Sequence, residues 1–251
     1  MGGALASVIS RNLENKVYVS DANTEKATEF AAAIGAHASQ SKAVASLSDF
    51  LFIGVKPNHI LSVADEIKDS LKPSCVIVSM AAGVTTRTLL EYFGEDKKII
   101  RIMPNTPVKV GRGVTSWCCS SKITRDDEET FISLMQPTGF CDKLSEELID
   151  AACAVAGCGP AFVYMFIEAL ANGAKACGLS ESKAILYAAK TLMGAAEMIA
   201  VTNESPKDLR DAVCSPGGST IEGVRALEAG GLSQTVIDAV IKSYEKTKKL
   251  K

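Results

Sequence analysis

A stretch near the C-terminal end of the chain combines residue types that favour binding of a small anion. It reads Cys-Ser-Pro-Gly-Gly-Ser-Thr and ends at Thr220. Pro216 cannot continue a helix, and Gly217 and Gly218 permit backbone angles that are closed to other residues. Ser219 or Thr220 is expected to cap the next helix, so that N–H groups and hydroxyls converge at a helix N-terminus. The pattern predicts a site for a small carboxylate, although an ordinary turn between two helices uses the same residues.

The composition argues against several other classes of function. The chain has 251 residues, 47% of them hydrophobic, and a formal net charge of −2, which indicates no broad basic surface for nucleic acid. Eight cysteines form no C-x-x-C pair, and His37 and His59 are the only histidines, so we predict no metal site. With no run of eighteen apolar residues and no signal peptide, we expect no membrane span. Reduced, buried thiols are typical of a cytoplasmic protein.

The first part of the chain alternates strand and helix patterns. Residues 50–55 and 75–79 are apolar strands of the kind found in parallel sheets buried on both faces. Further strands are predicted at 16–20, 99–103 and 114–119, with helices at 1–12, 24–34, 58–71, 85–93 and 125–136. The alternation predicts a doubly wound α/β sheet in a Rossmann-like domain at residues 1–144.

From about Ser145 the strand patterns stop. Six helices are predicted there, at 148–155, 160–177, 181–201, 206–213, 221–229 and 232–249. The helices that begin at Pro160 and Glu181 are apolar around most of their circumference, and such helices require burial on all sides. We therefore predict an all-helical domain at residues 145–251 that forms a homodimer, with a self-contained helical bundle as the alternative.

Several motifs occur in an order typical of one enzyme family. Besides the turn before Thr220, they are Val-Lys-Pro at 55–57, Ala-Ala-Gly at 81–83, Met-Pro-Asn-Thr-Pro at 103–107 and Gly-Cys-Gly-Pro-Ala-Phe at 157–162. On these motifs, which span nearly the whole chain, the sequence resembles the pyrroline-5-carboxylate reductases. The resemblance implies an NAD(P)H-dependent oxidoreductase that reduces the C=N bond of 1-pyrroline-5-carboxylate to L-proline, the last step of proline biosynthesis.

The resemblance assigns the substrate carboxylate to the turn. The candidate substrate-binding residues are Ser215, Gly217, Gly218, Ser219 and Thr220. Thr220 is the candidate catalytic residue, because its hydroxyl could also bond the ring nitrogen or relay a proton. A protonated iminium is already electrophilic, so the protein mainly has to position two reactants.

The cofactor is expected at the carboxyl ends of the strands, where dinucleotide folds bind their ligands. The candidate residues there are Val55, Lys56, Pro57, Ala81, Ala82, Gly83 and Asn105. The loop after the strand at 16–20, with candidates Ser20 and Asn23, would meet the adenosine ribose. The resemblance implies NADPH, with NADH as an alternative because Asp21 in that loop favours a free 2′-hydroxyl.

The expected dinucleotide fingerprint is only partly present. A strand and two glycines of the G-x-G-x-x-G turn would normally precede Met1, and Gly2 resembles the end of that turn. We expect the natural protein to be longer. Without that strand, its two neighbours would lose their ladder partners and most of the pyrophosphate cradle would be missing.

Two alternatives to the reductase remain. A β-hydroxyacid or imine dehydrogenase would share the architecture, but in that family a lysine precedes an asparagine in the helical domain, whereas Asn172 precedes Lys175 here. A non-catalytic dimeric remnant would keep the helical interface without binding cofactor. Assemblies larger than a dimer also occur in the reductase family.

Overall fold

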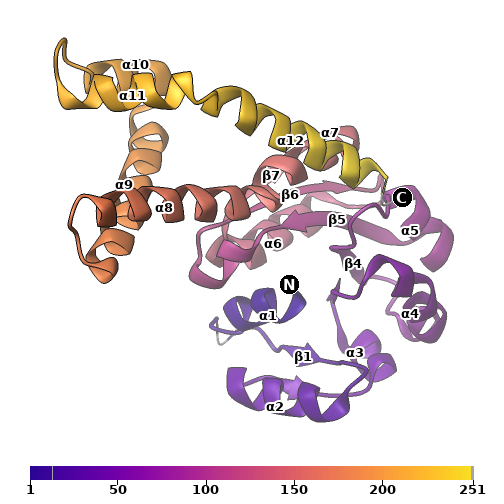
Figure 1. The fold of residues 1–251 in the computed structure, drawn as a ribbon. Coiled ribbons are helices and arrows are strands. Elements are labelled where there is room, and N and C mark those ends of the chain that lie inside the picture. Colours follow the sequence, from indigo (N-terminus) through magenta and orange to yellow (C-terminus); the bar gives the residue numbers. More distant parts are fainter. Residues whose placement is uncertain (13, 250–251) are drawn as a thin grey trace. The chain divides into compact units, whose positions relative to one another are not determined.

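A computed structural model describes residues 1–12 and 14–249 (Figure 1). By their contacts, the residues form two units. Unit 1 contains Met1–Cys158 and the chain from Ser243 onward, and unit 2 contains Gly159–Lys242. The helical segment therefore interrupts unit 1 rather than simply following it.

Unit 1 is an α/β domain whose described strands form two sheets. The smaller sheet pairs β1 (Tyr18–Val19) in parallel with β2 (His37–Ala38). The larger sheet has the order β3 (Phe50–Ile53), β4 (Val76–Ser79), β5 (Lys98–Pro104), β6 (Gly113–Cys119) and β7 (Gly139–Lys143). All neighbouring strands are parallel except β5 and β6. The Rossmann-like prediction is confirmed, and among the described strands β1 and β3 lie in separate sheets.

Helices cover both faces of the larger sheet (Figure 1). One face carries α3 (Ser41–Leu47), α4 (Ile60–Ile67) and α5 (Thr86–Phe93). The other carries α1 (Gly2–Ile9) and α6 (Arg125–Met135), with the Trp117 and Phe131 rings 5.0 Å apart between centroids. Every residue of β4 is buried, which accounts for its continuous apolar sequence.

α2 (Thr24–Ile34) packs beside the smaller sheet and has the boundaries expected from its sequence. The Asn23 side chain accepts a hydrogen bond from the Lys26 amide at its start. Gly35 ends the helix at φ 69°, a left-handed conformation that glycine adopts without steric cost.

A buried ion-pair network attaches α7 (Glu146–Ala152) to β5. The Arg101 side chain is 1% exposed and donates to Asp150 at 2.9 Å and to Glu146 at 3.2 Å. Glu146 also accepts from the Thr86 amide at 2.8 Å and the Thr86 hydroxyl at 2.6 Å. This packing keeps α7 and the following π-helical turn η5 (Cys153–Gly157) in unit 1, so the units divide after Cys158 and not after residue 144.

Full or partial burial affects three of the cysteines strongly. Desolvation raises the pKa of Cys75 and Cys141 to about 11 and that of Cys118 to about 12. These thiols stay protonated and act as small apolar side chains. Within residues 1–12 and 14–249, no cluster of three or more histidine, cysteine or acidic side chains could hold a metal ion.

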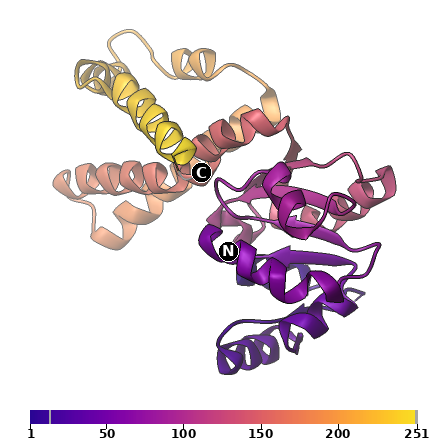
Figure 2. The ribbon, with the colours of Figure 1, turned by 90° about the vertical axis from the view of Figure 1, so that its right-hand side faces the viewer.

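Unit 2 is entirely helical in its regular structure. Its helices are α8 (Gly159–Ala176), α9 (Glu181–Thr202), α10 (Pro206–Ala212), α11 (Ser219–Ala229) and most of α12 (Leu232–Lys248). α8 and α9 lie side by side in both views, packed through Ala171, Ala184 and Ala188 (Figures 1 and 2). The last turns of α12 belong to unit 1, where Thr247 is 5% exposed and its hydroxyl contacts the Cys153 thiol.

The large apolar side chains of α8 and α9 are mostly exposed within one chain. They include Val163, Tyr164, Met165, Phe166, Leu170, Ile185, Leu186, Tyr187 and Met193. By length and composition alone, the helical stretches Glu146–Ala176 and Glu181–Thr202 could cross a membrane. The count of uninterrupted apolar residues missed this, because an average over a window tolerates the few glycine, proline and charged residues that interrupt such a run. Core helices of soluble proteins pass the same test, and these faces have the exposure that a dimer interface requires.

Candidate active site

Loops that follow β3 and β4 leave the larger sheet at the same edge. The ladder pairs Ile53 with Ser79 and Ser79 with Arg101, so the strands end in register. Val55–Pro57 follows β3, and Pro57 begins the 3₁₀ turn η1 (Pro57–His59). Ala81–Gly83 follows β4. The structure thus places these two predicted cofactor loops at the carboxyl edge, where a doubly wound sheet binds ligands.

Residues 81–83, in the loop after β4, carry only small side chains. Gly83 has φ 78°, which only glycine tolerates well, and Ala81 is 1% exposed, so no long side chain arises from these positions. Lys56 is exposed and precedes the first residue of η1. We expect a nicotinamide ring to approach residues 81–83 and Lys56 to lie beside the cofactor, and both contacts stay predictions.

Gly2 contacts the chain just beyond β3. A Cβ atom on Gly54 would lie 3.1 Å from the Gly2 Cα and 3.4 Å from its nitrogen, so this close approach favours glycine at position 54, whereas a Cβ atom on Gly2 would lie an ordinary 3.6 Å from the Gly54 Cα. α1 begins at Gly2, and the first amides of a helix have no intrahelical acceptor. The amides at the start of α1, beside this contact, have the chemistry that binds a phosphate group.

Asn105 follows β5, and its side chain is tied to the backbone. Its Nδ2 donates to the Ala156 carbonyl at 2.9 Å, and its Oδ1 accepts from the Val114 amide at 2.9 Å. The residue is 6% exposed. These bonds link the loop after β5 to η5 and to β6. The contact with cofactor that we expected from Asn105 stays a prediction, and the structure shows a bridging role in addition.

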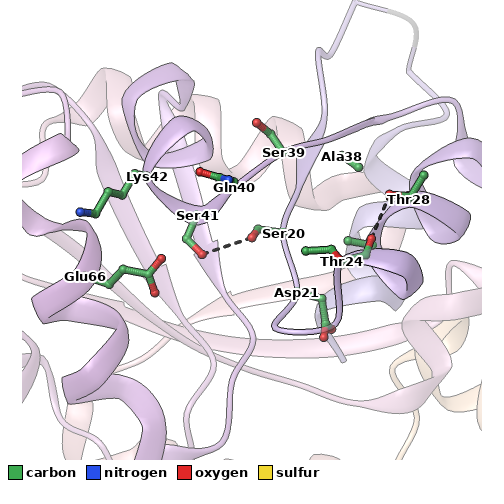
Figure 3. Close-up of a pocket in the computed structure, with 11 residues that line it drawn as sticks. Ser20, Asp21, Thr24, Thr28, Ala38, Ser39, Gln40, Ser41, Lys42 and Glu66 are labelled. Atoms are coloured by element: carbon green, nitrogen blue, oxygen red, sulfur yellow. Dashed lines mark hydrogen bonds between the residues drawn. The ribbon is translucent and has the colours of Figure 1, made fainter.

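A cavity of about 510 Å³ lies next to the loop that follows β1 (Figure 3). Its lining residues are Ser20, Asp21, Thr24, Ala27, Thr28, Ala38, Ser39, Gln40, Ser41, Lys42 and Glu66. The hydroxyl oxygens of Ser20 and Ser41 are 3.2 Å apart. Asn23 is absent from the lining, because its side-chain oxygen caps α2 at 2.9 Å from the Lys26 nitrogen. Hydroxyl groups, one lysine and two carboxylates line this hollow, and its size and polarity suit the adenosine end of a dinucleotide.

The sequence did not identify residues 39–42 as part of this cavity. They follow β2, which has only two residues, both exposed, and so leaves no apolar or alternating pattern to detect. A helix at Ser41–Leu47 was also missed, because it has seven residues and no side-chain cap. Such short elements are recognisable only from their packing on neighbours.

The turn in unit 2 has a tight, glycine-dependent backbone. The Gly218 amide donates to the Ser215 carbonyl at 3.0 Å, and Gly217 has φ 74°. Ser215, Gly217, Ser219 and Thr220 are exposed in the single chain, while Gly218 is half-buried. The turn therefore presents most of its polar atoms at the surface, and its geometry needs glycine at 217.

One prediction about this turn is wrong. α11 begins at Ser219 with Gly218 as its N-cap, and the cap makes no side-chain hydrogen bond, so neither Ser219 nor Thr220 caps the helix. Both lie inside the first helical turn, where the extended backbone of Gly218 has already started the helix. The first two amides of α11 and two hydroxyls thus gather at a helix N-terminus, while the Gly218 amide is engaged in the turn.

Comparison with known proteins places the chain in a family. Residues 146–250 match the family model described as pyrroline-5-carboxylate reductase dimerisation, and residues 1–83 match the model described as NADP oxidoreductase, coenzyme F420-dependent. The pyrroline-5-carboxylate reductase of Escherichia coli K12 is 39% identical over 251 residues, which cover 100% of this chain and 93% of the relative. This chain belongs to the pyrroline-5-carboxylate reductase family.

Further family members support the assignment. Human pyrroline-5-carboxylate reductase 2 is 40% identical over 206 residues, which cover 81% of this chain and 64% of the relative. The solved reductase from Coxiella burnetii superposes with a TM-score of 0.89 at 31% identity, over 99% of this chain and 94% of that one. The Plasmodium falciparum reductase with NADP bound gives a TM-score of 0.89 at 30% identity, over 100% and 94% of the two chains.

Proposed function

We propose that the chain is a pyrroline-5-carboxylate reductase, an NAD(P)H-dependent enzyme that reduces 1-pyrroline-5-carboxylate to L-proline. The match to the Escherichia coli reductase along the whole chain carries this proposal. Three features support it. The amides at the start of α1 could bind a phosphate, the small-residue loop after β4 could admit the nicotinamide, and the exposed turn in unit 2 could bind the substrate carboxylate.

NADPH is the proposed cofactor, with NADH as the second choice. One solved relative was crystallised with NADP bound, and the model matched by residues 1–83 carries NADP in its description. The first amides of α1 and the Gly2–Gly54 approach would hold phosphate, Lys56 would pair with phosphate or ribose, and residues 81–83 would admit the nicotinamide. When bound, the reduced nicotinamide supplies the hydride.

The substrate carboxylate is assigned to the turn in unit 2. The amides of Ser219 and Thr220 would bind its oxygens, with Ser215 and the two glycines shaping the turn. The Thr220 hydroxyl would bond the ring nitrogen, which already carries the proton of the iminium when the adjacent carbon takes the hydride to give the amine. The task of these residues is to orient the imine, because its protonated form is already electrophilic.

Replacing Thr220 by alanine is expected to raise the KM for pyrroline-5-carboxylate by about 10-fold to 100-fold, since a hydrogen bond to a charged group contributes about 1.5–3 kcal/mol. The KM for NADPH should change much less. Steady-state kinetics with each substrate varied in turn measures both constants. Thr235→Ala is the matched control, because that hydroxyl bonds to the Gly231 carbonyl at 3.1 Å within a helix start. Equal constants for Thr220→Ala and the unmodified chain would refute the assignment.

The family carries a dimerisation domain, and we propose that this chain forms a homodimer through unit 2. The exposed apolar side chains of α8 and α9 supply a surface that one chain cannot bury by itself. Larger assemblies built from such dimers are compatible with this surface. We further propose that the protein acts in the cytoplasm, since its buried thiols suit a reducing compartment.

Cofactor oxidation provides the direct test of function. The 251-residue chain would be mixed with NADPH, or with NADH in parallel, and the absorbance of the reduced nicotinamide followed on addition of pyrroline-5-carboxylate. We expect turnover with both, faster with NADPH. A cofactor titration monitored through Trp117, the single tryptophan, tests the alternative of a dimeric protein without cofactor binding. Absence of any change on titration would favour that alternative over the reductase.

A further inference from the structure

An acidic residue follows β1 and is held by its own neighbours. The Asp21 Oδ1 accepts the Asn23 amide at 3.1 Å, and its Oδ2 lies 3.1 Å from the Lys26 Nζ. Both contacts lower the pKa of Asp21, the amide more than the lysine, so the carboxylate stays ionised. An acid at this place ordinarily bonds the ribose 2′-hydroxyl of NADH and repels the 2′-phosphate of NADPH. The loop therefore carries a group that, taken alone, opposes the proposed cofactor.

Lys26 changes the electrostatics of this loop. It occupies the first turn of α2, its side chain is 70% exposed, and that of Asp21 is 41% exposed, so a ligand can reach the pair. An ammonium group has three donors and no acceptor. One donor meets Asp21 and two remain for a second anion. Asp21 lines the cavity of Figure 3, which supplies space for a group beside the carboxylate that Lys26 contacts.

Resting on the proposed function, we propose that Lys26 determines the preference for NADPH, by neutralising Asp21 and donating its remaining hydrogen bonds to the ribose 2′-phosphate. With NADH, Asp21 accepts from the 2′-hydroxyl, and the lysine contributes little. The loop thus accommodates both cofactors, and the lysine shifts the balance between them.

The other charges near the pair do not replace this lysine. Lys42 and Glu66 line the same cavity from α3 and α4, but among the ion pairs of the described residues Asp21 is matched with Lys26. Glu25, in the first turn of α2, is negative and cannot attract phosphate. Ser20 and Ser41 offer hydroxyl donors that are neutral. Lys26 is therefore the cation that pairs with Asp21, whose negative charge would otherwise repel the 2′-phosphate.

Binding of two probes isolates this effect from catalysis. The probes are ADP-ribose and its 2′-phosphorylated form, which differ only at the position in question, and isothermal titration calorimetry measures both dissociation constants on the full chain. Lys26→Gln should weaken binding of the phosphorylated probe by about 10-fold, equivalent to about 1.4 kcal/mol, and leave ADP-ribose within about 2-fold. Asp21→Asn should strengthen binding of the phosphorylated probe and weaken binding of ADP-ribose. Added salt should weaken only the phosphorylated probe strongly.

Lys68→Gln is the matched control. Lys68 forms a surface ion pair with Asp65 at 2.7 Å in another helix of the same unit, and its replacement should change neither constant. If Lys26→Gln weakens both probes equally, or neither, the assignment of Lys26 is overturned while the proposed function stands. If the unmodified chain binds neither probe, the cofactor proposal fails together with this one. The ratio of kcat/KM for NADPH over NADH should fall in Lys26→Gln in parallel with the binding data.

Discussion

Replacing Met165 by glutamate is expected to convert the protein from a dimer to a monomer. Met165 is 69% exposed on α8, and Tyr164 and Phe166 beside it are exposed as well. In a symmetric dimer the substitution enters the interface twice, and each carboxylate would lose its water without gaining a partner. A cost of several kcal/mol per buried unpaired charge is enough to separate the subunits at micromolar concentration. Sedimentation velocity gives the mass of the species directly.

The control for this substitution is Val110→Glu in unit 1. Val110 is 72% exposed at the end of the 3₁₀ turn η3 (Thr106–Val110), so a charge there remains in water. This variant should sediment as the unmodified protein does. Circular dichroism should show that both variants keep their helices. A Met165→Glu protein that stays dimeric, or a Val110→Glu protein that dissociates, would place the interface on a different surface.

Replacing Arg101 by methionine is expected to lower the free energy of unfolding by about 3–5 kcal/mol. The substitution keeps much of the side-chain volume but leaves Asp150 and Glu146 facing a buried position without their cation. Removal of one partner from a buried ion pair costs more than the pair contributes, because the remaining charge is uncompensated. Urea unfolding at one fixed protein concentration measures the change, since dimerisation makes stability depend on concentration.

Arg125→Met is the matched control for this prediction. Arg125 pairs with Glu129 at 2.8 Å on the surface, and its side chain is 89% exposed. Exposed pairs of this kind contribute roughly 0–1 kcal/mol, so the control should unfold near the urea concentration of the unmodified protein. A loss of less than 1 kcal/mol for Arg101→Met would mean that water reaches the network and solvates the two acids.

The sequence predicted the main elements of unit 1 because their signals are local. β4 reads as an apolar strand at 75–79, and α2 has a cap at Asn23 and a stop at Gly35. β7 (Gly139–Lys143) was missed, because its exposed Phe140 and polar neighbours give no buried pattern. The antiparallel pairing of β5 with β6 was also not predicted, since strand direction depends on how the connection folds back and not on composition.

The candidate site was also predicted only in part, because motifs can be recognised from the sequence but contacts between distant side chains cannot. Motifs at 81–83 and 215–220 are recognisable by residue type, and so their chemistry can be read from the chain. The pairing of Asp21 with Lys26 and the bridging of Asn105 to Ala156 depend on side-chain directions in three dimensions. Arg101 is the one charge within the apolar strand at 99–103, and a charge in such a strand is the signal that could have revealed a buried partner.

The return of α12 to unit 1 determines when, during synthesis, the core of unit 1 can be completed. The Thr247 hydroxyl contacts the Cys153 thiol, so the contacts of unit 1 are complete only when the final turns of α12 are present. Ribosomes add about 5–20 residues per second, and the intervening segment Gly159–Lys242 takes roughly 4–17 s to synthesise. During that interval the nascent α/β sheet is built but η5 lacks its cover. For these seconds the core of unit 1 is incomplete while the apolar helices of unit 2 leave the ribosome. We expect a chaperone to bind the chain during this interval.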